Sequence, residues 1–242
     1  MSNCKERRMQ RKIVAVISCY NEEPFIGEVI DWAKALCDHI VVSDDSSTDN
    51  SVEECVKRGV FVCCNPGVVR GAGSTLQRGI DFALQLNPDI IVTLDGDGQH
   101  NPIDISAMVK PILDGKAHIT IGSRFLEKDS DLKSYRKLGI QVITYLLNIG
   151  SKTKYTDGQC CFRAFTREAL EEIKTTDNGF SFSVEMLIKA RRLGYRAVEV
   201  PIFVVYHSIF SANSTSNPVI HGLKVCWGVL KWRTKIELFR RR

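Results

Sequence analysis

The chain alternates short, continuous apolar runs with longer segments whose apolar residues recur at helical spacing, and this alternation constrains the fold more than any other feature. The apolar runs, rich in β-branched residues, span 12–18, 39–43, 60–64, 89–93 and 118–121. The helical segments between them span 25–36, 50–58, 74–86 and 102–113. Strands that alternate with helices at these distances form βαβ units, in which helices cover both faces of a mostly parallel sheet. We therefore expect an α/β fold.

The second half of the chain continues this pattern less regularly. Helices are predicted over 136–148, 167–173 and 181–193, and strands over 158–166 and 196–206. Residues 218–239 mix apolar side chains and tryptophans with lysines, which predicts a basic amphipathic helix. A length of 242 residues fits one large domain. We divide the chain into a basic N-terminal segment (1–11), one α/β domain (12–210), and a mobile loop with the basic amphipathic helix (211–242).

Polar and acidic side chains follow three of the predicted strands at the point where each strand ends. They are Asn21-Glu22, Asp44-Asp45 and Asp95-Gly96-Asp97, and Arg124 follows the strand at 118–121. Ligands of open α/β sheets bind at the carboxyl edge, so these side chains are expected to meet there. The carboxylates of Asp95 and Asp97, with the amide of Gln99, suit a hard divalent cation that keeps positions open for phosphate oxygens. The alternative is a solvated Asp-Gly turn.

Phosphate binding alone does not name the reaction. A Walker loop needs Gly-Lys-Ser/Thr after the first strand, and a dinucleotide fold needs G-x-G-x-x-G there. The chain has Cys19-Tyr20-Asn21-Glu22 at that turn. The glycine-rich loop Arg70-Gly71-Ala72-Gly73 follows the third strand instead, where a tight turn into a helix explains it better than a phosphate cradle does.

Charge and cysteine content bear on location. The formal net charge is +5, but from residue 224 to the end seven basic residues stand against one acid, Glu237. No stretch approaches the roughly 18 uninterrupted apolar residues of a membrane span, and the apolar run after the basic N-terminal segment is too short and polar-flanked for a signal peptide. The nine cysteines are scattered and contain no C-x-x-C pair. We expect them to be reduced and mostly buried in a cytosolic protein.

Five motifs occur in order along the chain and together resemble a known family. They are Ser18-Cys19-Tyr20-Asn21-Glu22, Asp44-Asp45-Ser46-Ser47-Thr48-Asp49, Asp95-Gly96-Asp97-Gly98-Gln99-His100-Asn101-Pro102, Gly122-Ser123-Arg124-Phe125 and Cys161-Phe162-Arg163-Ala164-Phe165. This succession is similar to that of the family 2 inverting glycosyltransferases. Within that family it most resembles the dolichyl-phosphate mannose and glucose synthases and related polyprenyl-phosphate glycosyltransferases. The resemblance covers about residues 13–207.

The resemblance implies a single GT-A domain in which a nucleotide sugar lies across the ends of the first strands and Mg²⁺ or Mn²⁺ bridges its diphosphate. Tyr20, Asn21 and Glu22 would line the nucleoside pocket, and Asp45, with Asp44 beside it, would hydrogen-bond the base. The metal ligands implied are Asp95, Asp97 and Gln99. The implied nucleotide-sugar-binding set is completed by Ser18, Ser43, Gly96 and His207.

The same resemblance implies a catalytic set. Arg124 and Arg136 match positive residues that engage the acceptor phosphate and the leaving diphosphate, and Asp157 matches a residue near the sugar and acceptor. With Asp97, these form the implied catalytic residues. A lipid phosphate is already an anionic nucleophile, so positioning and charge neutralisation suffice without a strong base. Structural explanations stay open: Tyr20 could pack under the sheet edge, Asp45 could serve an Asx turn, and Arg136 could be a solvated helix start.

The chain also departs from the family pattern. Cys161 stands where relatives place a glycine beside the sugar pocket, so the donor preference is expected to differ. His207 stands where the synthases place an arginine that closes over the diphosphate, and can take that role. Glu185 lies mid-helix among apolar residues and needs a partner, for which Arg163 is the candidate.

We expect a metal-dependent inverting glycosyltransferase that transfers a sugar from a UDP- or GDP-sugar to a dolichyl or other polyprenyl phosphate, peripherally on the cytosolic face of a membrane. The C-terminal helix, assisted by the apolar helix at 138–147, is expected at the membrane surface. Alternatively it packs on the domain or on a second subunit of a homodimer. A same-fold transferase with a soluble or glycan acceptor, and a non-catalytic nucleotide-sugar-binding membrane scaffold, stay open. Nucleic-acid binding is not expected, because the basic tail lacks a recognition motif.

Overall fold

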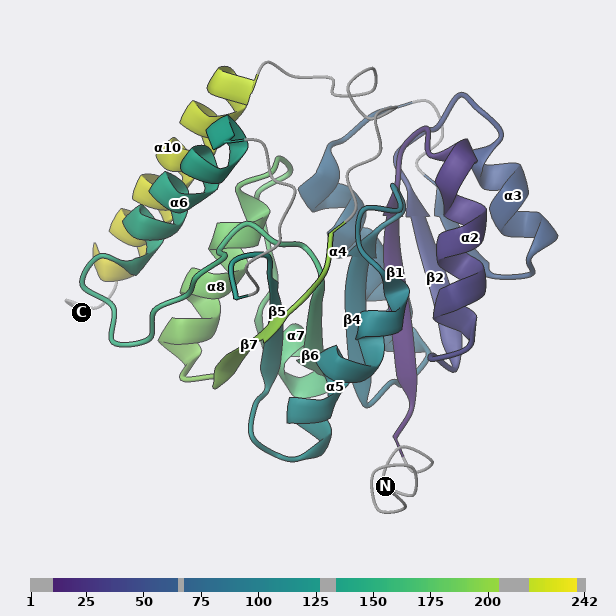
Figure 1. The fold of residues 1–242 in the computed structure, drawn as a ribbon, viewed down its shortest axis with the longest axis horizontal. Helices are drawn as coiled ribbons and strands as arrows, with labels where there is room; N and C mark the ends of the chain where they lie inside the picture. Colours follow the sequence, from purple (N-terminus) through teal and green to yellow (C-terminus); the bar gives the residue numbers. More distant parts are fainter. Residues whose placement is uncertain (1–10, 65–67, 127–133, 205–217, 239–242) are drawn as a thin grey trace.

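The computed structural model describes residues 11–64, 68–126, 134–204 and 218–238 (Figure 1). Within these ranges, seven strands form one sheet in the order β3-β2-β1-β4-β6-β5-β7. The strands are β1 (Ile13–Cys19), β2 (His39–Asp44), β3 (Phe61–Cys64), β4 (Ile90–Asp95), β5 (Ile119–Ser123), β6 (Arg163–Thr166) and β7 (Ala197–Pro201). β6 runs antiparallel to its neighbours β4 and β5, and all other neighbouring strands run parallel. The predicted mostly parallel α/β sheet is confirmed.

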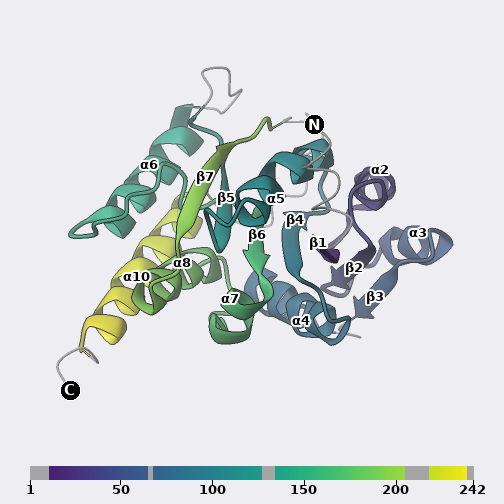
Figure 2. The ribbon, with the colours of Figure 1, turned by 90° about the horizontal axis from the view of Figure 1, so that it is seen from below.

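Helices cover both faces of this sheet. They are α2 (Glu23–Lys34), α3 (Ser51–Lys57), α4 (Ala72–Gln85), α5 (Ile105–Leu113), α6 (Ser134–Asn148), α7 (Arg167–Glu172), α8 (Phe182–Leu193) and α10 (Pro218–Leu238), with a 3-10 turn η1 at Pro102–Asp104. Seen from below, α2 and α5 lie on one face, and α4, α7 and α8 on the other (Figure 2). Successive residues of a strand point to opposite faces, so Ala15 and Ile17 of β1 pack with α2 and α5, while Val14 and Val16 pack with α4.

Two strands are shorter than the sequence predicts. The strand expected over 158–166 begins at Arg163, because only from there does the backbone pair with both β4 and β5. The strand expected over 196–206 is limited to Ala197–Pro201, where it pairs with β5. Beyond it, Val204 makes an isolated antiparallel bridge with His100. Apolar composition overestimates these strands because a buried loop is equally apolar: Phe162 is fully buried just before β6 begins.

The cysteines are less buried than expected. All eight that fall in the described ranges are free thiols. Cys19, Cys55 and Cys160 are buried, Cys64 is exposed, and the others are half-buried. The burial of each cysteine depends on the part of the fold that carries it, and the eight described cysteines do not share one site.

The C-terminal helix α10 packs on α6 and α8 at the β7 side of the sheet (Figure 1). Val225, Val229 and Trp232 are buried against these helices. Leu223, Trp227 and Leu230 lie on the opposite face and are exposed. α10 therefore presents apolar side chains on two opposite faces, so the single apolar face of an amphipathic helix is not shown. None of the helices in the described part of the chain is long and apolar enough to cross a membrane.

The two tryptophans of α10 allow a direct test of its packing. Trp232 is 3% exposed and Trp227 is 70% exposed. Trp232→Ala should lower the free energy of unfolding by about 3–5 kcal/mol, because it leaves a cavity between α10, α6 and α8. Trp227→Ala should change it by less than about 0.5 kcal/mol. Urea unfolding of both variants measures this, and equal losses would contradict the packing described.

Candidate active site

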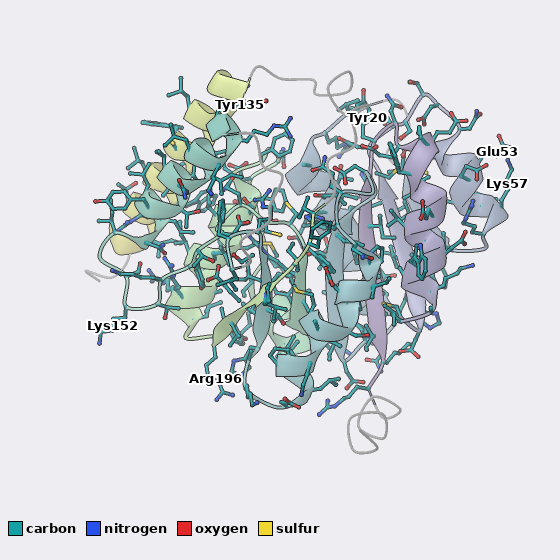
Figure 3. All side chains as sticks on the ribbon, viewed as in Figure 1. Tyr20, Glu53, Lys57, Tyr135, Lys152 and Arg196 are labelled. Atoms are coloured by element: carbon teal, nitrogen blue, oxygen red, sulfur yellow. The ribbon has the colours of Figure 1, made fainter. Side chains whose placement is uncertain are left out.

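Three strand ends meet at one edge of the sheet. Ser18 pairs in register with Ser43 on one side and with Asp95 on the other. The backbone N–H of Asp45 donates to the carbonyl of Cys19 at 2.9 Å, and that of Gly96 donates to the carbonyl of Ser18 at 2.8 Å. The loops after β1, β2 and β4 are thus joined to one another at their first residues. Figure 3 shows Tyr20 at this carboxyl edge and Arg196 at the opposite edge.

The loop after β4 carries the Asp-Gly-Asp-Gly motif in a tight conformation. A Cβ on Gly96 would lie 2.9 Å from Ile26 Cδ1 and 3.0 Å from the carbonyl oxygen of Ser18, so only glycine allows this close approach. Gly98 has a φ of 71°, in the left-handed region. The backbone N–H of Gln99 donates to Asp97 Oδ1 at 2.9 Å. The loop therefore fixes where the carboxylates of Asp95 and Asp97 stand.

Carboxylates crowd together at this edge. Burial and the charges of Asp97, Asp95 and Asp49 raise the pKa of Glu22 to about 8. Burial and the neighbouring Asp97 raise the pKa of Asp95 as well, against the opposing influence of Arg124. Glu22 Oε2 is buried and has no hydrogen-bond partner among the described residues. Glu22, Asp95 and Asp97 thus form a group of acids whose charges repel one another.

This acid group fits a hard divalent cation. Carboxylate oxygens are the ligands that Mg²⁺ and Mn²⁺ prefer, and a cation would relieve the repulsion that raises the pKa values of Glu22 and Asp95. The unpartnered oxygen of Glu22 points to the same conclusion. Within the described ranges, no three His, Cys, Asp or Glu side chains are arranged to hold a metal ion by themselves.

The loop after β1 is tied to the turn after β2. Asn21 has a φ of 55°. Its backbone N–H donates to Ser47 Oγ at 2.8 Å, and its Oδ1 accepts from the N–H of Thr48 at 2.8 Å. The N–H of Glu22 donates to Ser51 Oγ at 2.8 Å, and Tyr20 is partly exposed. Asn21 therefore links the two loops in this structure, and the nucleoside-lining role of Tyr20, Asn21 and Glu22 stays a prediction.

Asp45 and Ser43 lie under the start of α4. Asp45 is buried, and its carboxylate accepts from the backbone N–H groups of Arg70 at 3.0 Å and Gly71 at 2.8 Å. Ser43 Oγ donates to the carbonyl of Thr75 at 2.6 Å. Both side chains hold the 70–75 segment in place, a link that the weak glycine-rich pattern did not reveal. Their contact with a nucleotide stays a prediction.

Arg124 is held in a two-point ion pair by Asp157. Arg124 Nε lies 2.6 Å from Asp157 Oδ2, and an Arg124 terminal nitrogen lies 2.9 Å from Asp157 Oδ1. Asp157 is fully buried. Glu199 in turn accepts from the N–H groups of Thr156 at 2.8 Å and Asp157 at 2.9 Å. Asp157 therefore positions Arg124, and Glu199 positions Asp157. The sequence signal for Glu199 was a lone acid inside the apolar strand β7.

Other predicted residues are less connected to the site. Arg136 lies in the first turn of α6, and within the described residues its side chain makes no hydrogen bond or ion pair. α6 begins at the same end of the molecule as Tyr20, where Tyr135 is labelled (Figure 3). The first turn of α6, which carries Arg136, thus lies at the carboxyl-edge end of the molecule, and the catalytic role of Arg136 stays a prediction. His207 and the loop predicted at 211–218 lie outside the described residues.

The expected pairing of Glu185 with Arg163 is wrong. Glu185 accepts from the backbone N–H groups of Thr176 and Asp177, and Lys189 lies 2.6 Å from its Oε1. Arg163 donates to the carbonyls of Ser183 and Gly158 instead. Lys189 is one helical turn beyond Glu185 on α8, at the i,i+4 spacing where two side chains of a helix meet. It therefore pairs with Glu185 in place of Arg163.

His100 is a buried residue beside the acids that sequence reasoning left without a role. Its Nδ1 lies 4.0 Å from Asp95 Oδ2 and has no hydrogen-bond partner in the described structure. Burial and the nearby Arg124 lower the pKa of His100 to about 3, so the ring is neutral. In the sequence His100 stood out only as part of the motif that runs from Asp95 to Pro102.

The sheet order, the acids at its carboxyl edge and the covering helices define a GT-A glycosyltransferase. A family model described as Glycosyl transferase family 2 matches residues 14–174. The chain belongs to glycosyl transferase family 2, and it is a glycosyltransferase. This confirms the family that the five motifs predicted.

Relatives agree with the predicted subgroup. The UDP-N-acetylglucosamine–dolichyl-phosphate N-acetylglucosaminyltransferase of Methanococcus voltae is 30% identical over 242 residues, covering 90% of this chain and 94% of the relative. The polyprenol monophosphomannose synthase of Mycolicibacterium smegmatis is 27% identical, covering 92% and 89%. The glucosyl-3-phosphoglycerate synthase of Mycobacterium tuberculosis, solved with Mn²⁺, UDP and phosphoglyceric acid, has a TM-score of 0.71 at 20% identity, covering 96% of this chain and 81% of that one. At that identity, the similarity shows the shared fold.

The crowding of acids predicts a pH-dependent stability of the ligand-free protein. Because the pKa of Glu22 is raised to about 8 from an ordinary 4.5, the protein loses stability as the pH rises through that window. Glu22→Gln removes the ionisable group. The variant should melt at least about 2–4 °C higher than the wild type at pH 8.5, which corresponds to about 1 kcal/mol, and the difference should shrink at pH 5. Differential scanning calorimetry measures both.

Glu28→Gln is the matched control for Glu22→Gln. Glu28 lies on the exposed side of α2, where its carboxylate accepts only from Trp32 Nε1, at 3.3 Å, among the hydrogen bonds the structure records for it. A gain in Glu28→Gln equal to that in Glu22→Gln, or a Glu22→Gln gain that does not grow with pH, would contradict the acid group.

Proposed function

We propose that the protein transfers a sugar from a nucleotide-sugar donor to a polyprenyl phosphate, with inversion and with the help of Mg²⁺ or Mn²⁺. The observation that supports it most is the group of repelling acids Glu22, Asp95 and Asp97 facing the fixed cation Arg124. Two related proteins are named for transfer to dolichyl phosphate and for polyprenol monophosphomannose synthesis. A structural neighbour was crystallised with Mn²⁺ and UDP.

The donor would lie across the carboxyl ends of β2, β1 and β4. Asp95, Asp97 and Gln99 would hold the cation, which neutralises the charge of the leaving diphosphate. Tyr20, Asn21 and Glu22, with Ser18, Ser43, Asp45 and Gly96 nearby, would hold the nucleoside and diphosphate. The rigid ties among these loops mean that the binding surface is largely formed before the donor arrives, which limits the ordering cost of binding.

The acceptor would approach from the side of β5 and α6. Arg124, oriented by Asp157, would bind the acceptor phosphate, and Arg136 would approach it from the first turn of α6. A phosphate oxygen then forms a bond to the anomeric carbon as the bond from that carbon to the nucleoside diphosphate breaks. The phosphate is ionised, so no residue has to remove a proton, and the chain contributes positioning and positive charge.

A lipid acceptor requires contact with a bilayer, and α6 and α10 offer a surface for it. The exposed apolar side chains on α6 are Tyr135, Leu138, Val142 and Tyr145, Ile149 directly follows the helix, and those on α10 are Leu223, Trp227 and Leu230. Residues 134–154 and 218–236 together contain eight Lys and Arg residues and no Asp or Glu. Apolar side chains set among cations suit an anionic, cytosolic membrane face. We define these eight apolar residues as the α6–α10 surface.

The acid pair should be essential to donor use. With UDP- or GDP-sugars, Mn²⁺ or Mg²⁺ and a polyprenyl phosphate in detergent, the wild type should release nucleotide, and Asp97→Ala should reduce release by at least about 10³-fold. Thermal unfolding of the variant controls for folding. Asp97→Ala with near wild-type release would contradict the proposal. Release that needs a soluble phosphorylated compound instead of the lipid would favour a second candidate, since the structural neighbour was crystallised with phosphoglyceric acid.

The α6–α10 surface should govern activity on membranes. Leu223→Ser, Trp227→Ser and Leu230→Ser combined should leave donor turnover on a short-chain polyprenyl phosphate in detergent unchanged, because these side chains are exposed. Sedimentation with anionic vesicles should fall by at least about tenfold. Val56→Ser, exposed on α3, is the control. Vesicle binding that persists in the triple variant would contradict the membrane role. A wild type that elutes as a dimer in size-exclusion chromatography, with a triple variant that elutes as a monomer, would also contradict it.

A further inference from the structure

His100 occupies a distinctive place directly behind the acid loop. It follows Gln99, its backbone bridges Val204, and its ring lies 5.4 Å from that of Phe162, centroid to centroid. The side chain is more than nine-tenths buried. Its Nδ1 has no hydrogen-bond partner among the described residues, and faces Asp95 Oδ2 at 4.0 Å. A buried polar nitrogen without a partner costs free energy, so its orientation toward Asp95 calls for an explanation.

The surroundings of the ring indicate which nitrogen carries the proton. The second nitrogen, Nε2, lies 3.8 Å from Cys160 Sγ. A thiol is protonated near neutral pH and can donate, although Cys160 Sγ also lies 3.8 Å from the carbonyl of Phe162. The carboxylate of Asp95 favours one of the two tautomers of His100. A carboxylate that holds a cation is ionised and only accepts, so a proton on Nδ1 gives attraction, whereas a lone pair there would face the lone pairs of Asp95.

We propose that His100 is a positioning residue of the metal site: seated on Cys160 and Phe162, it donates its Nδ1–H to Asp95 Oδ2 and fixes the orientation of that carboxylate. The inference rests on the proposed metal-dependent function. At 4.0 Å the two atoms are just beyond hydrogen-bond distance, so a small rotation of the Asp95 side chain would close the contact. A residue behind a metal ligand in this way raises metal affinity by restricting how the ligand turns.

The charges that face His100 are consistent with this role. Arg124, which follows β5, and Asp157, from the segment between α6 and β6, are joined in their own ion pair. Among the described residues, Asp95 is thus the one whose carboxylate oxygen faces Nδ1 of His100. Phe162 and Cys160 lie beside the ring as well.

Two substitutions of the same residue separate positioning from packing. In His100→Asn the amide nitrogen is attached to Cγ, as Nδ1 is, so it can still reach Asp95. In His100→Gln the amide lies one bond farther out, toward Cys160. Both replace a ring by an amide, so a purely structural role predicts similar effects on stability and binding. The readout is the affinity for Mn²⁺ in the presence of UDP or GDP, followed by the paramagnetic resonance signal of free Mn²⁺.

We expect His100→Asn to keep Mn²⁺ affinity within about threefold of the wild type, and His100→Gln to weaken it by about 10–100-fold. His118→Gln, at the amino end of β5, should match the wild type. Equal Mn²⁺ affinities in His100→Asn and His100→Gln would overturn the inference, whether both are weakened or neither is. If the wild type itself binds no Mn²⁺ with either nucleotide, the proposed function fails instead, which keeps the two failures distinguishable.

Discussion

The crowding of three carboxylates, those of Glu22, Asp95 and Asp97, is the feature on which the rest of this structure depends. Parallel pairing of β1 with β4 brings Glu22 near Asp95 and Asp97, and their partial burial weakens the screening of their charges by water. Such a group is unfavourable by itself, and a divalent cation, which the proposed function requires, would relieve the repulsion. The fold therefore trades stability for binding at this edge, as functional sites commonly do.

The other half of the site supplies positive charge in a fixed position. Arg124 is oriented by Asp157, which is itself held by Glu199 of β7. A residue of an edge strand thus determines where the guanidinium of Arg124 lies. Asp95 ends β4 and Asp97 follows it, Glu22 follows the neighbouring β1, and Arg124 follows β5 on the other side of β4. In the proposed reaction a donor diphosphate and an acceptor phosphate would each meet the charge they need, and α6 and α10 carry exposed apolar side chains.

Much of this could be predicted from the sequence, because alternating apolar runs and helical segments fix a parallel sheet and place Asp95 and Asp97 at its carboxyl edge. What could not be predicted depends on contacts between distant segments. Sequence spacing gave no sign that Glu199 reaches Asp157, or that His100 turns its Nδ1 toward Asp95. Local geometry also overrode a reasonable pairing, since Lys189 rather than Arg163 takes Glu185. The two faces of α10 were missed because composition alone does not show which neighbours cover a helix.

The most direct test of this account is the affinity of the wild-type protein for UDP and GDP, measured by isothermal titration calorimetry with Mn²⁺ and again with EDTA. If Asp95, Asp97 and Gln99, with Glu22 nearby, hold a cation shared with a diphosphate, one of the two nucleotides should bind at least about tenfold more tightly with Mn²⁺, which corresponds to about 1.4 kcal/mol. Equal affinity for both nucleotides with and without the metal would contradict it.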